Sequence, residues 1–297
     1  MTFYSTQSRF TDPGAMASWL DSVGPDLADI RAAAAQLVFH YRAQGDITDH
    51  GFPPEREAEI DLRYADDMLS RLHELNPAPP EKARAATERV VGCCRDSTLL
   101  FVAMARHHGI PARARVGFGT YLIADWALDH VIAEVWDAAE QRWRLVEPEF
   151  EDGQVDVDLL DVPADQFLVG ADAWAACRSG SLDAQRCVVS PELELPFLRG
   201  WPYLMHNLVV DLAALNKHEM LLWDLWGVIE TADPTDDGVA RQMDALAARL
   251  RVPGLTVDQL TAAFDVDGLR VPDVITSVTP HTRQPRQVTL RSAATGA

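Results

Sequence analysis

The sequence predicts an α+β fold in which one buried helix packs against a small antiparallel sheet. The helix-length segment that follows Gly92 contains the continuous apolar run 99–104, so this helix is expected to be apolar on almost all of its faces. Residues 113–121 alternate between polar and apolar side chains, as a half-buried strand does. Two further strands, 130–137 and 142–149, are joined by residues 138–141 as a hairpin. A helix on an antiparallel sheet forms an α+β layer.

Residues 1–91 are expected to form an N-terminal helical region that covers one side of this layer. Apolar residues recur at spacings of three and four, and breaks containing Gly or Pro separate the periodic segments. The expected helices span 16–23, 27–41, 60–75 and 80–91.

The core segment is expected at 92–152, followed by a C-terminal helical region at 153–279. Prolines separate the periodic segments of the latter region, whose expected helices span 163–179, 202–229, 237–251 and 256–264. The last stretch, 280–297, contains Arg283, Arg286 and Arg291 but no acids, and is rich in Pro, Thr, Ser and Ala. We expect it to be a disordered tail.

Composition excludes several classes of function. The 297 residues are 47% hydrophobic, enough for a substantial core. With 26 basic and 45 acidic residues the formal charge is -19, so a phosphate backbone would be repelled and nucleic-acid binding is not expected.

Residues 1–10 contain no apolar core of signal-peptide length, and Asp211, Lys217 and Asp224 interrupt the most apolar later stretch. We therefore expect a cytoplasmic protein without membrane contact. Four cysteines in such a chain are expected to be thiols.

Cys94 is the leading candidate for a catalytic residue. It lies where the stretch Gly92 to Asp96 opens the apolar helix. The helix dipole and the free N–H groups at a helix N-terminus favour a thiolate, and a nearby imidazole completes a nucleophile–base pair. His130, on the strand that follows within forty residues, is the candidate base.

Two carboxylates could orient His130. If Asp137 pairs with Arg142 across a four-residue loop, Glu149 lies opposite His130 and Glu147 is its diagonal neighbour. A two-residue loop would place Glu147 opposite instead. Both carboxylates remain candidates at this point.

The order of these motifs resembles the transglutaminase-like core superfamily. The motifs are Gly-Cys-Cys-Arg-Asp at 92–96, Ala-Arg-His-His-Gly-Ile-Pro-Ala-Arg at 105–113, Asp-His at 129–130 and Arg-Trp-Arg-Leu-Val-Glu-Pro at 142–148. Segments 172–178 and 207–217 also look like the C-terminal part of bacterial proteins with this core. The resemblance implies a papain-like Cys-His-Asp triad, in which Cys94 and His130 match directly. Glu147 stands where the family usually has Asp, one methylene shorter.

The resemblance implies a cofactor-free cysteine enzyme that acts on a peptide, amide or acyl-thioester carbonyl. Cys94 would attack as a thiolate, His130 as imidazolium would protonate the leaving amine, and Glu147 would orient the imidazole. Water or an amine would resolve the acyl-thioester. The Cys94 N–H is the expected oxyanion donor, and a second donor cannot be identified from the sequence.

Two other functions are possible. A degenerate transglutaminase-like module could bind peptides or a partner protein without turnover, and the Glu147 difference motivates this alternative. Cys93 and Cys94 could instead sense oxidants by forming a vicinal disulfide.

The remaining residues with notable chemistry are expected to be structural. Asp96 suits the first turn of a helix without any catalytic role. His206 and His218 have no CxxC or HExxH motif nearby, so a metal site is not expected. The others assigned to packing are Cys93, Cys177, Cys187, Trp201, Trp223 and Trp226.

Overall fold

A computed structural model describes residues 2–292 and has an α+β fold built on a five-stranded sheet. The sheet order is β5-β4-β3-β6, with antiparallel neighbours, and β7 pairs with β4 in parallel. In the β4–β5 hairpin Asp137 pairs with Arg142, which is the four-residue alternative of the two registers. The strands are β3 (Ala112–Gly119), β4 (Ala127–Asp137), β5 (Arg142–Val146), β6 (Phe167–Val169) and β7 (Cys187–Val188).

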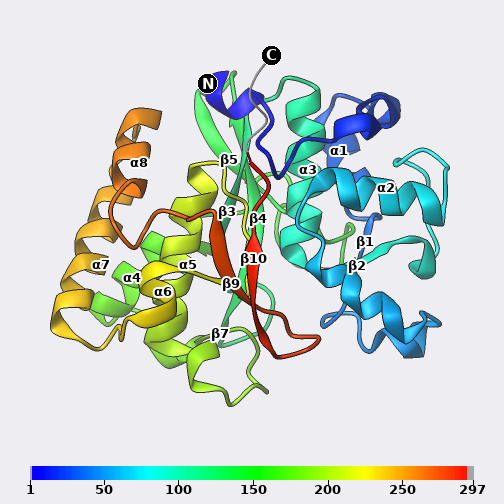
Figure 1. Cartoon of the computed structure of the whole chain (residues 1–297). Coiled ribbons are helices and arrows are strands. Elements are labelled where there is room, and N and C mark those ends of the chain that lie inside the picture. The colour runs from blue at the N-terminus through cyan, green and yellow to red at the C-terminus, as the bar shows by residue number, and fades with distance from the viewer. Residues whose placement is uncertain (1, 293–297) are drawn as a thin grey trace.

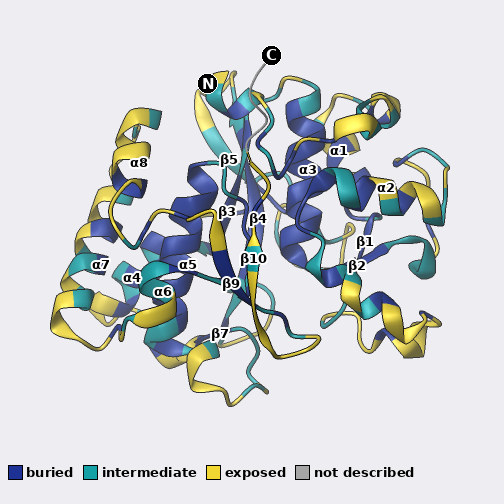
Figure 2. Ribbon diagram, viewed as in Figure 1, coloured by how far each residue is buried: buried dark blue, intermediate teal, exposed yellow. Residues whose placement is uncertain are grey.

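Two buried helices cover this sheet from opposite sides, α3 (Cys94–His107) and α5 (Gly200–Leu215). Figure 1 shows the strands between them. The hydroxyl of Thr98 on α3 donates to the Val131 carbonyl of β4 at 2.8 Å. On the other side, the side chain of Asn207 on α5 donates to the Gly117 carbonyl of β3 at 3.0 Å. Both helices are almost wholly buried (Figure 2), which confirms the predicted central helix.

The N-terminal region is not all helical, so that prediction is wrong. The helices α1 (Leu27–Ala34) and α2 (Ala65–Leu75) form, but the expected helix 27–41 stops at residue 34 and 80–91 does not form one. Instead β1 (Val38–His40) and β2 (Val90–Gly92) pair in parallel. Val, Phe and a Val-Val pair favour extended backbone, and this tertiary pairing outweighs the helical spacing of the segment. As a result, β2 runs directly into Cys94, with His40 on the strand beside it.

The C-terminal helical region mostly follows its prediction. The helices α7 (Asp237–Leu250) and α8 (Val257–Phe264) form where expected. α4 (Gly170–Ser179) begins later than predicted because residues 167–169 form β6. The expected helix 202–229 ends at residue 215, since Lys217 takes a left-handed conformation with a φ of 60°. The rest of that segment forms β8 (Asp224–Leu225) and α6 (Gly227–Thr231).

The expected disordered tail is wrong for residues 280–292. β10 (Pro285–Thr289) pairs with β9 (Val274–Val278), which also pairs with β8. Two of its three arginines pair with acids of the N-terminal region, Arg286 at 2.8 Å from Asp61 and Arg291 at 2.8 Å from Asp66. Composition alone could not show these distant partners. Residues 293–297 lie outside the described residues.

The connections contain short 3-10 helices, and no described helix is long and apolar enough to span a membrane. One contiguous hydrophobic cluster includes residues from Phe10 to Leu290 and so joins the N-terminal and C-terminal regions. The 3-10 helices are η1 (Thr2–Ser5), η2 (Gly14–Ser22), η3 (Ile47–His50), η4 (Pro54–Asp61), η5 (Ala86–Glu88), η6 (Ala184–Arg186) and η7 (Pro196–Leu198).

Candidate active site

Cys94 is the first residue of α3 and is buried, with 3% of its surface exposed. The N–H of Cys93, the N-cap residue, donates to the Asp96 carboxylate at 2.9 Å and thereby fixes the first turn. Asp96 is also paired with Arg95 at 3.0 Å, as expected for a residue that stabilises the start of the helix. A side chain on Gly92 would place its Cβ only 2.6 Å from the Asp96 carboxylate, so the tight approach of β2 to the helix requires glycine. The Cys94 N–H has no intrahelical acceptor at this position.

His130 on β4 is held by Glu147. The His130 Nε2 lies 2.7 Å from a Glu147 carboxylate oxygen, and both side chains are buried. The hydroxyl of Tyr121 donates to the same oxygen, and the N–H of Glu149 donates to the other oxygen at 3.0 Å. Glu147 therefore acts as a fixed acceptor, so Nε2 carries a proton and Nδ1 faces the opposite way.

This pairing shifts the pKa of both groups. Burial alone would lower the pKa of His130, but the charge and hydrogen bond of Glu147 outweigh it and, with Glu149 and Asp129, raise the pKa to about 9. Burial would raise the pKa of Glu147, but His130 holds it below its ordinary value. Imidazolium and carboxylate stabilise each other here.

Glu149 reaches the other nitrogen of His130. One of its carboxyl oxygens lies 4.0 Å from Nδ1. Burial, together with the charges of Glu147 and Asp96 and against that of His130, raises the pKa of Glu149 to about 8. The two carboxylates that the sequence left open thus both lie near His130. Only Glu147 makes a hydrogen bond with the ring.

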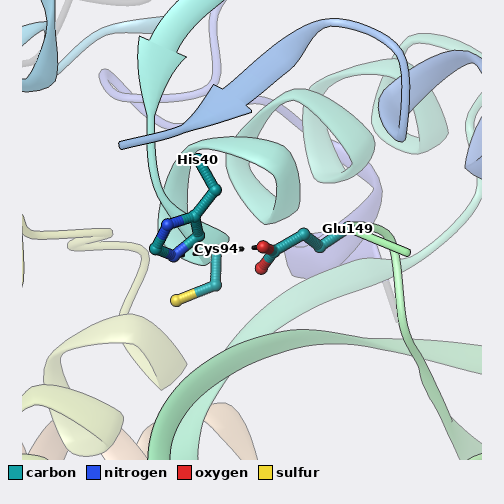
Figure 3. Close-up of side chains that lie close together, drawn as sticks. All are labelled: His40, Cys94 and Glu149. Carbon is teal, nitrogen blue, oxygen red and sulfur yellow. Dashed lines mark ion pairs between the residues drawn. The ribbon is translucent and has the colours of Figure 1, made fainter. Parts of the chain in front are cut away.

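Cys94 is surrounded by Glu149 and by a second histidine, His40 of β1. The sulfur, one His40 ring nitrogen and one Glu149 carboxyl oxygen all lie within 4.8 Å of one another (Figure 3). His40 Nε2 lies 3.9 Å from the Glu149 carboxyl. Sequence reasoning missed His40 because it lay within an expected helix. The extended-backbone preference of Val38 and Phe39 was the available signal.

The thiolate expected at the helix N-terminus is not favoured in this arrangement. Contact with the neighbouring Cys93 thiol and burial raise the pKa of Cys94 well above its ordinary value, and the charges of Glu149 and Asp129 act in the same direction. The Cys93 contact, the loss of water and the neighbouring carboxylates all disfavour the charged form of the thiol. Cys94 is therefore a thiol at neutral pH, which corrects the sequence-based expectation.

The donor set around Cys94 does not fit a metal ion. His40 Nδ1 accepts the backbone N–H groups of Arg42 and Ala43 at 3.1 and 3.0 Å. In neutral imidazole the other nitrogen, Nε2, must then carry the proton. A histidine that binds a metal through Nε2 instead donates the Nδ1 proton to a neighbour. The two backbone donors exclude that arrangement, so His40 offers an N–H group rather than a lone pair.

Asp129 anchors the strand end that carries His130. It accepts from the Tyr203 hydroxyl at 2.7 Å and from the Asn207 side chain at 2.9 Å, both on α5. His206 stacks on Tyr203, with ring centroids 5.1 Å apart. The Asn207 segment singled out in the sequence therefore positions the sheet beneath the site.

The residues assigned to packing are mostly buried. Trp223 and Trp226 lie in the core, and half-buried Trp201 packs on Trp174 with centroids 5.2 Å apart. Cys93, Cys177 and Cys187 are buried free thiols. The sulfurs of the last two lie 3.8 Å apart.

Two comparisons found proteins that are similar to part of this chain. The sequence model of the Transglutaminase-like superfamily matches residues 53–148, which include Cys94, His130 and Glu147. Among solved structures, a candidate cysteine protease from Cytophaga hutchinsonii is 15% identical, with a TM-score of 0.35. The match covers 56% of this chain and 44% of that one, so this chain spans less than half of its length. No curated protein matches the sequence.

Proposed function

We propose that this chain, which carries a transglutaminase-like core over residues 53–148, is a cysteine-dependent acyl-transfer enzyme with Cys94 as its nucleophile. His130 is the general base and Glu147 positions it. The observation that carries the proposal is the 2.7 Å pairing of His130 Nε2 with Glu147. It leaves Nδ1 on the side of the Glu149 carboxyl, which lies 4.0 Å from that nitrogen and within 4.8 Å of the Cys94 sulfur.

Acylation begins with proton transfer. Neutral His130 takes the Cys94 thiol proton on Nδ1 while the sulfur attacks the substrate carbonyl carbon, and the carbonyl oxygen becomes an oxyanion. His130 then gives the proton to the leaving nitrogen as the C–N bond breaks and the acyl-thioester remains on Cys94. Glu147 stabilises the imidazolium that exists between the two steps. The Cys94 N–H at the start of α3 donates to the oxyanion.

The acyl-thioester has two possible fates. Water, deprotonated by His130, attacks the thioester carbon and releases a carboxylic acid together with the free thiol. An amine attacks in the same way and yields a new amide. We propose hydrolysis as the main reaction, on an amide, peptide or thioester substrate, because it requires no second binding site.

Acyl-enzyme trapping tests this function. The wild-type protein is incubated with p-nitrophenyl acetate and examined by intact-protein and peptide mass spectrometry. We expect an acetyl adduct on Cys94 and none on Cys93, with an initial burst of one p-nitrophenolate per protein before slower turnover. Cys94→Ser should form no thioester, and Cys177→Ser serves as the matched control. A wild-type protein that is never acetylated at Cys94 would instead support the non-catalytic binding module.

A further inference from the structure

The site contains a second imidazole, that of His40. Its Nε2–H faces the site, whereas His130 turns its Nε2–H to Glu147. His130 has its Nε2 proton engaged by Glu147 and its Nδ1 open. His40 has its Nδ1 lone pair engaged by two backbone N–H groups, from Arg42 and Ala43. Its Nε2–H therefore points into the site. One ring is built to accept a proton, whereas the other is built to donate a hydrogen bond.

The fold holds His40 in this position. In the parallel pair of β1 and β2, His40 is opposite Gly92, two residues before Cys94. Its backbone N–H donates to the Gln44 side chain at 2.7 Å, which closes the turn that supplies the two N–H donors. The ring stacks on Tyr41, with planes 10° apart. The side chain is mostly buried, with 15% of its surface exposed.

His40 is also kept neutral. Burial, with the nearby positive charges of His130 and Arg42, lowers the pKa of His40 to about 3. A neutral imidazole with a fixed N–H cannot take the thiol proton, because its only lone pair is already used. Neutral imidazoles of this kind polarise carbonyl groups in other enzymes.

The separations suit an oxyanion. Donors act at about 2.7–3.1 Å from the oxyanion. A His40 ring nitrogen and the Cys94 sulfur lie within 4.8 Å of each other, which leaves room for one oxygen bound to the carbon that the sulfur attacks. Figure 3 shows the ring beside the sulfur and the Glu149 carboxyl. The carboxyl lies 3.9 Å from Nε2, beyond hydrogen-bond reach, and so leaves the N–H available.

We propose that His40 is a catalytic residue that donates its Nε2–H to the oxyanion of the tetrahedral intermediate on Cys94. This inference rests on the proposed acyl-transfer function. Together with the Cys94 N–H, it supplies the second donor that the sequence could not identify. The carbonyl oxygen gains negative charge as the S–C bond forms, and loses it when the C–N or C–O bond breaks.

Two reactions of the same sulfur test the role of His40. Acetylation by p-nitrophenyl acetate forms an oxyanion, whereas alkylation by iodoacetamide displaces iodide without one. His40→Phe keeps a planar ring but removes the N–H. We expect it to slow single-turnover acetylation of Cys94 by about 10²- to 10³-fold, the usual effect of losing one such donor. Alkylation of Cys94 should be no slower than in the wild-type protein.

Further variants separate this role from a structural one. His40→Gln retains a side-chain N–H and should recover part of the lost acetylation rate. His73→Ala, an exposed histidine on α2, should match the wild-type protein in both reactions. If His40→Phe does not melt as the wild-type protein does, His40→Ala is measured in the same two reactions. Acetylation at the wild-type rate without the N–H, or an equal loss in both reactions, contradicts the role of His40. A wild-type protein that is not acetylated contradicts the acyl-transfer function itself.

Discussion

His130 and Glu147 form a buried pair in which the imidazole Nε2 lies 2.7 Å from the carboxylate. His130 belongs to β4, and Glu147 lies in the segment just after β5. There the N–H of Glu147 donates to the Leu159 carbonyl at 2.8 Å. That bond replaces further pairing with β4 and lets the longer Glu side chain reach the ring. The extra methylene relative to Asp is therefore compatible with an orienting role.

The pairing predicts the pH dependence of acylation. His130 must be neutral to take the thiol proton, and its pKa is raised to about 9. The acetylation rate of Cys94 should therefore rise with pH, reach half its maximum near pH 9 and level off above that. The ionisable groups near the ring are Glu147, Glu149, Asp129, Tyr121 and His40.

Glu147→Gln should shift the rise in acetylation rate to lower pH, because the group that raises the pKa of His130 most has lost its charge. The limiting rate should also fall, by roughly 10²- to 10⁴-fold, since the ring loses its fixed tautomer. Single-turnover acetylation across pH measures both effects. Glu140→Gln, at the exposed tip of the hairpin, is the control. An unshifted rise in Glu147→Gln would show that Glu147 does not govern His130.

Glu149 should make Cys94 less reactive at high pH. Its pKa is raised to about 8, so it is uncharged below that pH and anionic above it. The anion raises the pKa of Cys94. In Glu149→Gln, iodoacetamide should therefore alkylate Cys94 faster than in the wild-type protein at pH values above about 8. The rate of alkylation should change little at lower pH. Slower alkylation of Cys94 in this variant at high pH would contradict the assignment.

Gly117 of β3 lies between His130 on β4 and the backbone of β6. It pairs with His130 across β3 and β4, and an added Cβ would lie only 2.1 Å from the Leu168 carbonyl of β6. Gly117→Ala should therefore force β6 away and destabilise the protein by about 1–3 kcal/mol or more. Urea unfolding measures the change. Gly153→Ala, whose Cβ would meet no atom within 4 Å, is the comparison, with a cost from backbone conformation alone. Equal midpoints for the two variants would argue against the close contact.

The sequence predicted those parts of the fold that local pattern determines. The apolar run of α3 and the β3–β5 strands have clear periodicity. The sequence left the hairpin register open between two loop lengths, and the structure has the four-residue loop. β1 was missed because three extended residues become a strand only when they pair with distant Val90 and its neighbours. The strand in the tail was missed for the same reason, since Arg286 and Arg291 pair with the distant Asp61 and Asp66.

The candidate site was predicted in part. Cys94, His130 and the two possible carboxylates follow from motif order and strand period. His40 was missed because residues 27–41 were expected to form one helix, whereas the pairing of β1 with β2 places it near Cys94. Its tautomer depends on the backbone N–H groups of Arg42 and Ala43, which only the folded turn brings to the ring. The pKa of Cys94 was predicted in the wrong direction, since burial and the carboxyl of Glu149 are tertiary effects.

The most direct test of the account is the rate of Cys94 acetylation in His130→Ala. Single-turnover reactions with p-nitrophenyl acetate, followed by peptide mass spectrometry, measure the rate in a variant shown to melt like the wild-type protein. The account predicts a fall of about 10²- to 10⁴-fold, because the thiol has lost the base that takes its proton. Acetylation of Cys94 at the wild-type rate in His130→Ala would contradict it.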